Sequence, residues 1–180
     1  PKELLPILDK PMLQYVVEEA AEAGIEKVII VTAPGKESIA AYFQPDPGLE
    51  QQLADAGALD LLEKVRHVSN LAQVSFVTQE QPLGLGHAVW TAREAVGNEP
   101  FVVILPDDIV AHTPGVTAQM LEVYRRFNAG VVAVEPMSWE AIHRYGVVRG
   151  VPVAERVLRV EGMVEKPLPE QAPSNLAIVG

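Results

Sequence analysis

The first part of the chain carries apolar side chains at two different spacings. Between Pro11 and Ala23 they recur on one face of a helix, and Gly24 follows as a stop signal. Residues 27–31 instead form a continuous, mostly β-branched run, which is typical of a strand buried on both faces. Similar patterns predict further helices over residues 37–43, 49–67, 84–96, 114–127 and 138–143. They predict further strands over residues 73–78, 101–105, 131–135, 147–148, 157–160, 163–165 and 177–179.

The alternation of these helices and strands predicts βαβ units, and hence an α/β fold with a mainly parallel central sheet. One domain over residues 1–180 is the economical interpretation. Trp90 falls on a predicted helix face and is assigned to the core. In sheets of this kind ligands bind beyond the carboxyl ends of the strands. The residues that follow each strand are therefore the candidates for chemistry.

Composition narrows the classes of function. Hydrophobic residues make up 48% of the chain and charged residues 21%, as in a globular domain. Lys and Arg total 14 against 24 Asp and Glu, a formal net charge of −10 that disfavours a nucleic-acid polymer as partner. No apolar run is long enough to span a bilayer, so no membrane association is expected. Cysteine is absent, which excludes thiolate chemistry and fits a cytoplasmic location.

Asp107 and Asp108 directly follow the predicted strand 101–105. Carboxylates at the end of a strand suit an oxygen-ligated cation such as Mg²⁺. A cation there would screen the charge of a triphosphate and polarise a phosphoryl oxygen. The alternative is that one of the two carboxylates only caps the turn before Pro114.

Gln79 and Gly84 are candidates for binding a nucleotide base. Gln79 lies at the end of the predicted strand 73–78, directly after its last residue, and its amide can both donate and accept hydrogen bonds at a base edge. Gly84 and Gly86 begin a predicted helix, where the backbone can approach a ligand closely. The segment is neither a P-loop nor a G-x-G-x-x-G motif. Tight packing of a helix end is the alternative interpretation.

Lysines in irregular, proline-bounded settings are candidates for binding phosphate. Lys2 and Lys166 could each act as a compact cation on a phosphate, and Glu165 could accept hydrogen bonds from sugar hydroxyls. The alternative for Glu165 and Lys166 is a solvated surface pair that contributes little. The four histidines show no metal-ligand spacing and are interpreted as surface or capping residues: His67, His87, His112 and His143.

Six segments, taken in chain order, resemble the sugar-nucleotide pyrophosphorylase family of nucleotidyltransferases. Each segment is short, but the ordered set is specific and spans essentially the whole chain. Gly-Leu-Gly-His-Ala, Leu-Pro-Asp-Asp and Pro-Ser-Asn-Leu-Ala-Ile-Val-Gly are most similar to the bacterial glucose-1-phosphate uridylyltransferase branch. The thymidylyltransferase branch, with Gly-Leu-Ala-Gln-Ala at the first of these, is the nearest alternative. The segments are residues 1–20, 79 with 84–88, 105–108, 145–147, 164–167 and 173–180.

The resemblance implies a Rossmann-like, three-layer nucleotide-diphospho-sugar transferase fold. It implies the reaction of UTP with glucose 1-phosphate to give UDP-glucose and pyrophosphate, with Mg²⁺ as cofactor. Such a transfer needs positioning and charge neutralisation rather than an enzyme nucleophile. A transferase for another base or sugar, or a non-catalytic sugar-nucleotide-binding module, remains an alternative.

On the nucleotide side, the resemblance gives roles to four residues. Lys2 would stabilise charge near the attacked phosphorus, and Asp107 would hold Mg²⁺. Gln79 and Gly84 would recognise the edge of the uracil ring. These assignments agree with the positions of Asp107 and Gln79 at predicted strand ends.

On the sugar side, the resemblance gives roles to four further residues. Gly146, Glu165 and Lys166 would hold the sugar 1-phosphate, with Lys166 on its phosphate group. Asn175 is a further candidate on this side.

The resemblance also predicts family features outside this sequence. The family's first strand and glycine-rich loop would precede Pro1, and a second metal-binding Asp and dimer contacts would follow Gly180. We therefore expect a partial domain that is inactive when expressed alone, and a homo-oligomeric parent enzyme.

Overall fold

The computed structural model describes residues 1–179, so Gly180 at the end of the segment 173–180 lies outside the described residues. The chain divides into two compact units, Pro1–Ala111 and His112–Gly180, and each is described by itself. The expectation of a single domain over residues 1–180 stays a prediction. Across residues 1–179, no helix has both the length and the apolar character needed to cross a bilayer.

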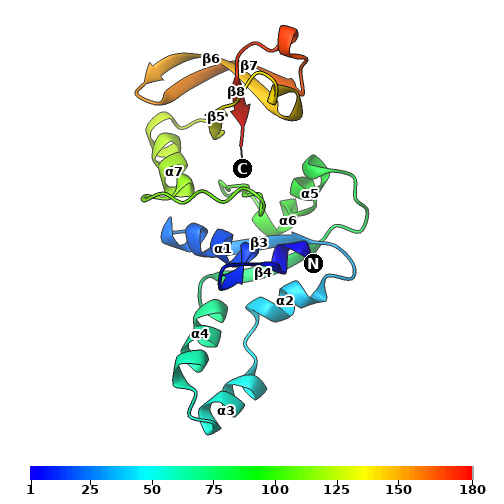
Figure 1. Ribbon diagram of the computed structural model, residues 1–180, viewed down its shortest axis with the longest axis vertical. Helices are drawn as coiled ribbons and strands as arrows, with labels where there is room; N and C mark the ends of the chain where they lie inside the picture. The colour runs from blue at the N-terminus through cyan, green and yellow to red at the C-terminus, as the bar shows by residue number, and fades with distance from the viewer. Residues whose placement is uncertain (180) are drawn as a thin grey trace. The chain divides into compact units, whose positions relative to one another are not determined.

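The first unit is built around a parallel pair of strands. β3 (Lys27–Thr32) and β4 (Gln73–Thr78) pair in register, Lys27 opposite Gln73 and Thr32 opposite Thr78. Parallel strands need a long crossover, and here it consists of helices (Figure 1). Both strands therefore end at the same edge, which carries Gln79. The crossover helices are α2 (Glu37–Phe43), α3 (Pro47–Asp55) and α4 (Leu59–Ser69).

The core of the first unit joins three elements. Leu13 and Val17 on α1 (Met12–Glu22) pack with Ile30 of β3 and with Phe43 of α2. Val17 is 1% exposed and Phe43 3%. Burying a side chain of this size stabilises a fold by about 1.5–3 kcal/mol. The helical spacing of the apolar residues thus fixes which face of α1 covers the sheet.

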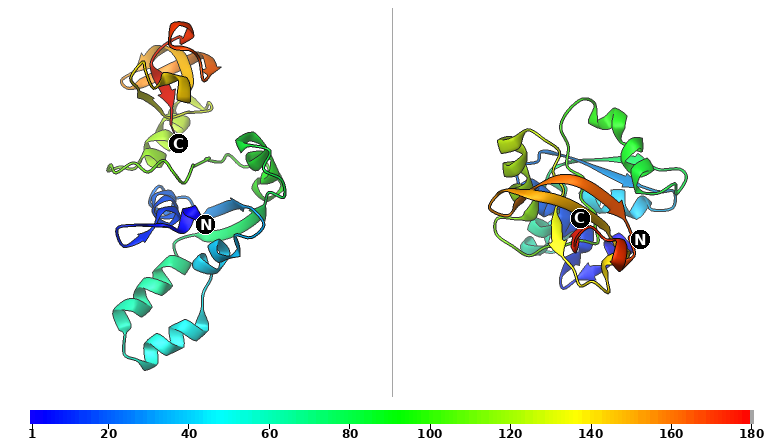
Figure 2. Two further views of the ribbon diagram at one scale, coloured as in Figure 1. Left: turned by 45° about the vertical axis from the view of Figure 1, so that its right-hand side comes forward. Right: turned by 90° about the horizontal axis from the view of Figure 1, so that it is seen from above.

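The predicted helix over residues 49–67 is two helices. α3 begins earlier, because the Asp46 carboxylate accepts a hydrogen bond of 2.9 Å from the Leu49 amide and caps the helix. Gly57, with a φ of 68°, then breaks the helical path before α4. The two helices extend away from the β3–β4 pair as a helical hairpin (Figures 1 and 2).

The helix predicted over residues 84–96 is also divided. α5 (Leu85–Thr91) is followed by α6 (Arg93–Val96). Trp90 is 61% exposed, so its assignment to the core is wrong. The Arg93 guanidinium lies 4.3 Å from the ring centroid and covers part of the ring at the surface. The other elements of this unit are η1 (Lys2–Leu4), β1 (Pro6–Ile7) and β2 (Lys10–Pro11).

Residues 101–105 do not form the predicted strand. Among residues 1–179, the segment has no ladder partner, and Phe101 is 58% exposed. A hydrophobic run shows that a segment can enter a sheet, but a strand also needs a neighbour to pair with.

The second unit contains a four-stranded antiparallel sheet in the order β5-β8-β6-β7. The α/β fold class is confirmed, but within residues 1–179 parallel pairing is limited to β3 and β4. For β6 and β7 the reason is local, because a tight turn at Glu155 and Arg156 joins them and such a short connection can join only antiparallel strands. The strands are β5 (Val134–Pro136), β6 (Gly146–Ala154), β7 (Val157–Glu165) and β8 (Leu176–Ile178).

A small core lies beneath this sheet. Ile142, Val147 and Ala177 are each 0% exposed and come from three different elements. The unit also contains three helical segments: α7 (Val116–Phe127), which ends at Asn128 in the left-handed conformation, η2 (Ile142–Arg144) and η3 (Pro169–Gln171).

Candidate functional site

Lys2 and Asp107 lie side by side in the first unit, although they are far apart in the sequence. The Lys2 Nζ atom is 3.6 Å from Asp107 Oδ2. Lys2 belongs to η1, and Asp107 follows the extended segment 101–105. Their side chains are 68% and 60% exposed, and an ion pair this exposed contributes little to stability. Both groups are therefore accessible to a ligand.

Asp107 fits a magnesium ion that is shared with a phosphate ligand. Within residues 1–179, no three His, Asp or Glu side chains gather into a group able to hold a metal ion. Mg²⁺ is commonly held by one or two carboxylates, with water and substrate phosphates completing the shell. One exposed carboxylate, as at Asp107, matches that pattern. A site in which the protein alone supplies all the ligands would not match it.

A second ion pair anchors the turn that carries Lys2. The Lys36 ammonium donates a hydrogen bond of 2.7 Å to Glu3 Oε1, across 33 residues of sequence. Burial raises the pKa of the Glu3 carboxyl, but the hydrogen bond and charge of Lys36, with a contribution from Lys2, outweigh it, so the pKa lies below its ordinary value. This contact fastens η1 to the segment between β3 and α2.

Gln79 and Gly84 contact each other, and His87 joins them. Gln79 follows β4, and its Nε2 donates to the Gly84 carbonyl at 3.2 Å. The same Nε2 lies 2.8 Å from His87 Nδ1, on the first turn of α5. Gly84 has a φ of 93°, a conformation that side chains disfavour. The glycine is thus needed for the turn that brings α5 back to the end of β4.

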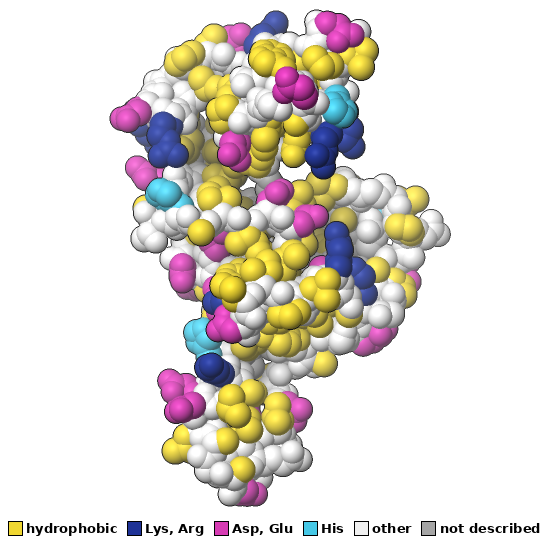
Figure 3. All heavy atoms as spheres, in the orientation of Figure 1, with side chains coloured by type: hydrophobic (Ala, Val, Ile, Leu, Met, Phe, Trp, Pro, Cys, Tyr) yellow, Lys and Arg dark blue, Asp and Glu magenta, His cyan; other side chains and the backbone are white. Residues whose placement is uncertain are grey.

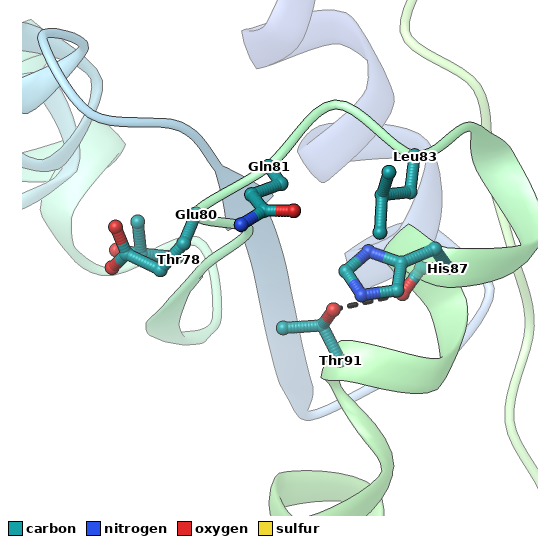
Figure 4. A pocket seen from close by; sticks show the side chains of 6 residues that line it. All are labelled: Thr78, Glu80, Gln81, Leu83, His87 and Thr91. Carbon is teal, nitrogen blue, oxygen red and sulfur yellow. Dashed lines mark hydrogen bonds between the residues drawn. The ribbon is translucent and has the colours of Figure 1, made fainter.

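A pocket of about 270 Å³ lies beside this cluster. Thr78 and Glu80, the neighbours of Gln79 in sequence, both line it. Figure 4 shows the His87 ring between Leu83 and Thr91, with the Thr91 hydroxyl bonded to the His87 backbone at 2.8 Å. The pocket is lined by Thr78, Glu80, Gln81, Leu83, His87 and Thr91.

Gly146, Glu165 and Lys166 come together in the second unit. Gly146 on β6 is opposite Glu165 on β7, and a Cβ atom at Gly146 would lie 3.2 Å from Glu165 Oε2. The Lys166 ammonium is 3.5 Å from Glu165 Oε1. The Lys166 amide donates to the Tyr145 carbonyl at 3.0 Å, and its φ of 44° turns the chain away from the strand. The Glu165 carboxylate therefore lies beside Gly146, which has no side chain, and the Lys166 ammonium lies next to that carboxylate.

Asn175 has a different environment in the second unit. Its Nδ2 donates to the Met137 carbonyl at 3.1 Å, and its own carbonyl accepts from the Met137 amide at 2.9 Å. These bonds join the segments that flank β5 and β8. The structure gives Asn175 a bridging contact and does not place it with the cluster at Gly146.

Local charge matters here because the chain as a whole is acidic. On the face drawn in Figure 3, acidic and basic side chains are interspersed, with exposed apolar side chains between them. An anionic ligand would therefore be attracted by individual cations such as Lys2 and Lys166 and not by a broad basic surface.

Sequence reasoning missed two features of these clusters. His87 was interpreted as a surface or capping residue, but it is partly buried and contacts Gln79. Its place on the first turn after Gly84 was the available signal. The Glu3–Lys36 pair carries no local signal, because only the fold brings η1 to the end of β3.

Comparisons with known proteins identify the family of the chain. A family model described as nucleotidyl transferase matches residues 1–180. The UTP–glucose-1-phosphate uridylyltransferase of Bacillus subtilis (strain 168) is 48% identical over 181 residues, which cover 100% of this chain. The chain spans 62% of the length of that relative.

Solved structures match over the whole chain as well. A crystal structure of UDP-glucose pyrophosphorylase complexed with UDP-glucose has a TM-score of 0.88 at 43% identity, and the match covers 66% of that protein. A UTP-bound UGPase from Acinetobacter baumannii has a TM-score of 0.91 at 38% identity, with 65% covered. Because the family model covers every residue, the chain belongs to the nucleotidyl transferase family.

Proposed function

We propose that the protein transfers a uridylyl group from UTP to glucose 1-phosphate, giving UDP-glucose and pyrophosphate. The observation that carries the proposal is the contact between Lys2 and Asp107, 3.6 Å apart. It places the Lys2 ammonium, which can bind phosphate, next to the Asp107 carboxylate, which can bind a metal ion. The relatives support the choice of substrates, since a relative at 48% identity is named for this reaction and a similar solved structure is bound to UDP-glucose.

The reaction is an in-line displacement at the α-phosphorus of UTP. A phosphate oxygen of glucose 1-phosphate forms the new P–O bond, and the bond to pyrophosphate breaks, so the pair of electrons leaves with pyrophosphate. The protein has to align the two substrates and neutralise charge. No side chain needs to form a covalent intermediate.

On the nucleotide side, Lys2 neutralises charge beside the attacked phosphorus, and Gln79 with Gly84 binds the uracil edge. Asp107 would hold Mg²⁺, which when bound would supply further charge neutralisation at the phosphates. Electrostatic stabilisation of this kind is often the largest contribution to catalysis. The exposure of Lys2 and Asp107 supports their availability to a triphosphate.

On the sugar side, Lys166 binds the phosphate of glucose 1-phosphate, and Glu165 accepts hydrogen bonds from sugar hydroxyls. Gly146 leaves room beside the Glu165 carboxylate, since a Cβ atom would come within 3.2 Å of it. Asn175 would act indirectly on sugar-phosphate binding, because its bond to Met137 positions the backbone next to β8.

The test is a substrate panel with the full-length protein. UTP, dTTP, ATP and GTP are each offered with glucose 1-phosphate and Mg²⁺, and pyrophosphate release is measured. We expect UTP to be strongly preferred. Preference for dTTP would favour the thymidylyltransferase alternative, and binding of UDP-glucose without turnover would favour a binding module. The cytoplasmic location and the homo-oligomeric state expected from the sequence stay predictions.

A further inference from the structure

The amide of Gln79 is held in one orientation. Its Nε2 lies 3.2 Å from the Gly84 carbonyl oxygen and 2.8 Å from His87 Nδ1. A carbonyl oxygen can only accept a hydrogen bond, so the atom facing it has to be the amide nitrogen. The orientation of the Gln79 amide follows from that contact.

The same contact determines the protonation state of His87. Because the Gln79 nitrogen is a donor, His87 Nδ1 has to accept from it. The ring is then neutral and carries its proton on Nε2. The two amide hydrogens of Gln79 are matched to two acceptors, the Gly84 carbonyl and His87 Nδ1.

What Gln79 can still offer to a base is therefore its Oε1 atom, which only accepts. Uracil presents an N–H donor at ring position 3, whereas cytosine presents a lone pair there. Two acceptors that face each other repel, and neither is satisfied. An amide held in this orientation favours uracil over cytosine.

We propose that His87 is a positioning residue that sets the choice of pyrimidine, by holding the Gln79 amide with its oxygen toward the base. The inference rests on the proposed function, because it assumes that Gln79 binds the base. It adds a residue and a reason for the preference. Without an acceptor at His87, the amide loses its shorter contact of 2.8 Å and keeps the Gly84 contact of 3.2 Å. It is then held less firmly, and a larger share of the molecules present the amide nitrogen to cytosine.

Three variants of the full-length protein test this role. His87→Leu removes the acceptor, whereas the carbonyl oxygen of His87→Asn can accept in place of Nδ1. His143→Leu is the matched control, because His143 is an exposed histidine of the second unit. Calorimetry measures the dissociation constants of UTP and CTP, and steady-state kinetics gives the Michaelis constant for glucose 1-phosphate.

We expect His87→Leu to weaken UTP binding roughly tenfold and to lower the ratio of UTP to CTP affinity. The Michaelis constant for glucose 1-phosphate should change little. His87→Asn should keep most of the preference, and His143→Leu all of it. An unchanged preference in His87→Leu overturns the inference, and so does an equal loss in His87→Asn and His87→Leu.

A measurement on the unaltered protein does not depend on how the variants fold. Long-range proton–nitrogen NMR spectra report which ring nitrogen of His87 carries the proton. We expect the proton on Nε2 at neutral pH, and a proton on Nδ1 would overturn the inference. If the unaltered protein does not prefer UTP to CTP, the proposed function itself fails, and that outcome is distinct from the failure of His87 alone.

Discussion

At the scale of single residues, Asp107 is the side chain on which most of the proposed catalysis depends. We predict that Asp107→Asn in the full-length protein lowers turnover by roughly 10²–10³-fold at saturating Mg²⁺, because a charge clamp on the phosphates is weakened. Stability should hardly change, since the carboxylate is 60% exposed. Asp108→Asn is the matched control and should cost less. Near-normal turnover of Asp107→Asn at saturating Mg²⁺ would rule out the role.

Variants of Lys166 and Glu165 would separate two parts of the proposed sugar-phosphate binding. Lys166→Ala should raise the Michaelis constant for glucose 1-phosphate about tenfold or more, because an ion-assisted hydrogen bond to phosphate is lost. Glu165→Ala should weaken sugar binding and leave the affinity for UTP unchanged. Steady-state kinetics and calorimetry on the full-length protein measure these effects. Wild-type behaviour of both variants would make the segment purely structural.

Sequence alone could identify the residues that sit in recognisable local patterns. Asp107 and Gln79 each follow an apolar run that predicts a strand. Both were candidates because ligands bind beyond the carboxyl ends of strands in such sheets. The role of His87 was missed because its place after Gly84 is a weak signal that does not identify Gln79 as its partner. Its contact with Gln79 depends on the turn at Gly84, which folds α5 back onto the end of β4.

At the scale of elements, the Glu3–Lys36 contact joins η1 to the start of α2. Glu3→Gln should lower the free energy of unfolding at pH 7 by about 1 kcal/mol, discounted for the partial exposure of Lys36. The folded-state pKa of Glu3 lies below the ordinary value of a glutamate carboxyl. The stabilisation is therefore present above that value and is lost as pH falls through the lowered pKa.

Denaturant unfolding at a series of pH values measures this difference. The gap between wild type and Glu3→Gln should be constant near neutral pH and should close at acidic pH. Lys36→Met is the companion variant and should reproduce the loss. A gap that persists after Glu3 is protonated would show that the variant disturbs packing and not the ion pair.

Element prediction succeeded where one pattern governed a whole segment. α1 has apolar residues on one face, with Pro11 before it and Gly24 after it, and β3 is a β-branched run. The prediction of one helix over residues 49–67 was wrong. Gly57 lies among residues that all tolerate a helix, so the sequence gives little local signal of the break. The apolar pattern of residues 101–105 predicted a strand that the structure does not contain. A strand needs a neighbour to pair with, and a local pattern does not specify that neighbour.

At the scale of the whole molecule, the extended segment 101–105 should exchange its amide hydrogens faster than the paired strands. Its amides have no ladder partner among residues 1–179, whereas β3 and β4 share a continuous ladder. Hydrogen exchange on the 180-residue chain, followed by NMR or mass spectrometry, should give rates roughly tenfold or more above those of the ladder amides. Equal protection would mean that the segment pairs in solution.

The order of motifs along the chain identified the family, because six weak segments in one sequence are jointly specific. The topology of the second unit was less accessible. Val147–Val148 and the later apolar runs predicted strands correctly, but strand direction depends on the connections, and the tight turn at Arg156 makes β6 and β7 antiparallel. Pattern predicts which segments enter a sheet, and connection length decides their direction.

At position 166, selection for a stable fold and selection for the proposed phosphate binding should favour different residues, because the backbone is left-handed there. With a φ of 44°, the position suits Gly or Asn better than a long side chain. A library of all amino acids at position 166, sorted for folded protein, should therefore enrich Gly and Asn. The same library sorted for growth that depends on UDP-glucose should enrich Lys. The disagreement between the two rankings measures how much conformational preference the chain gives up to keep an ammonium group there.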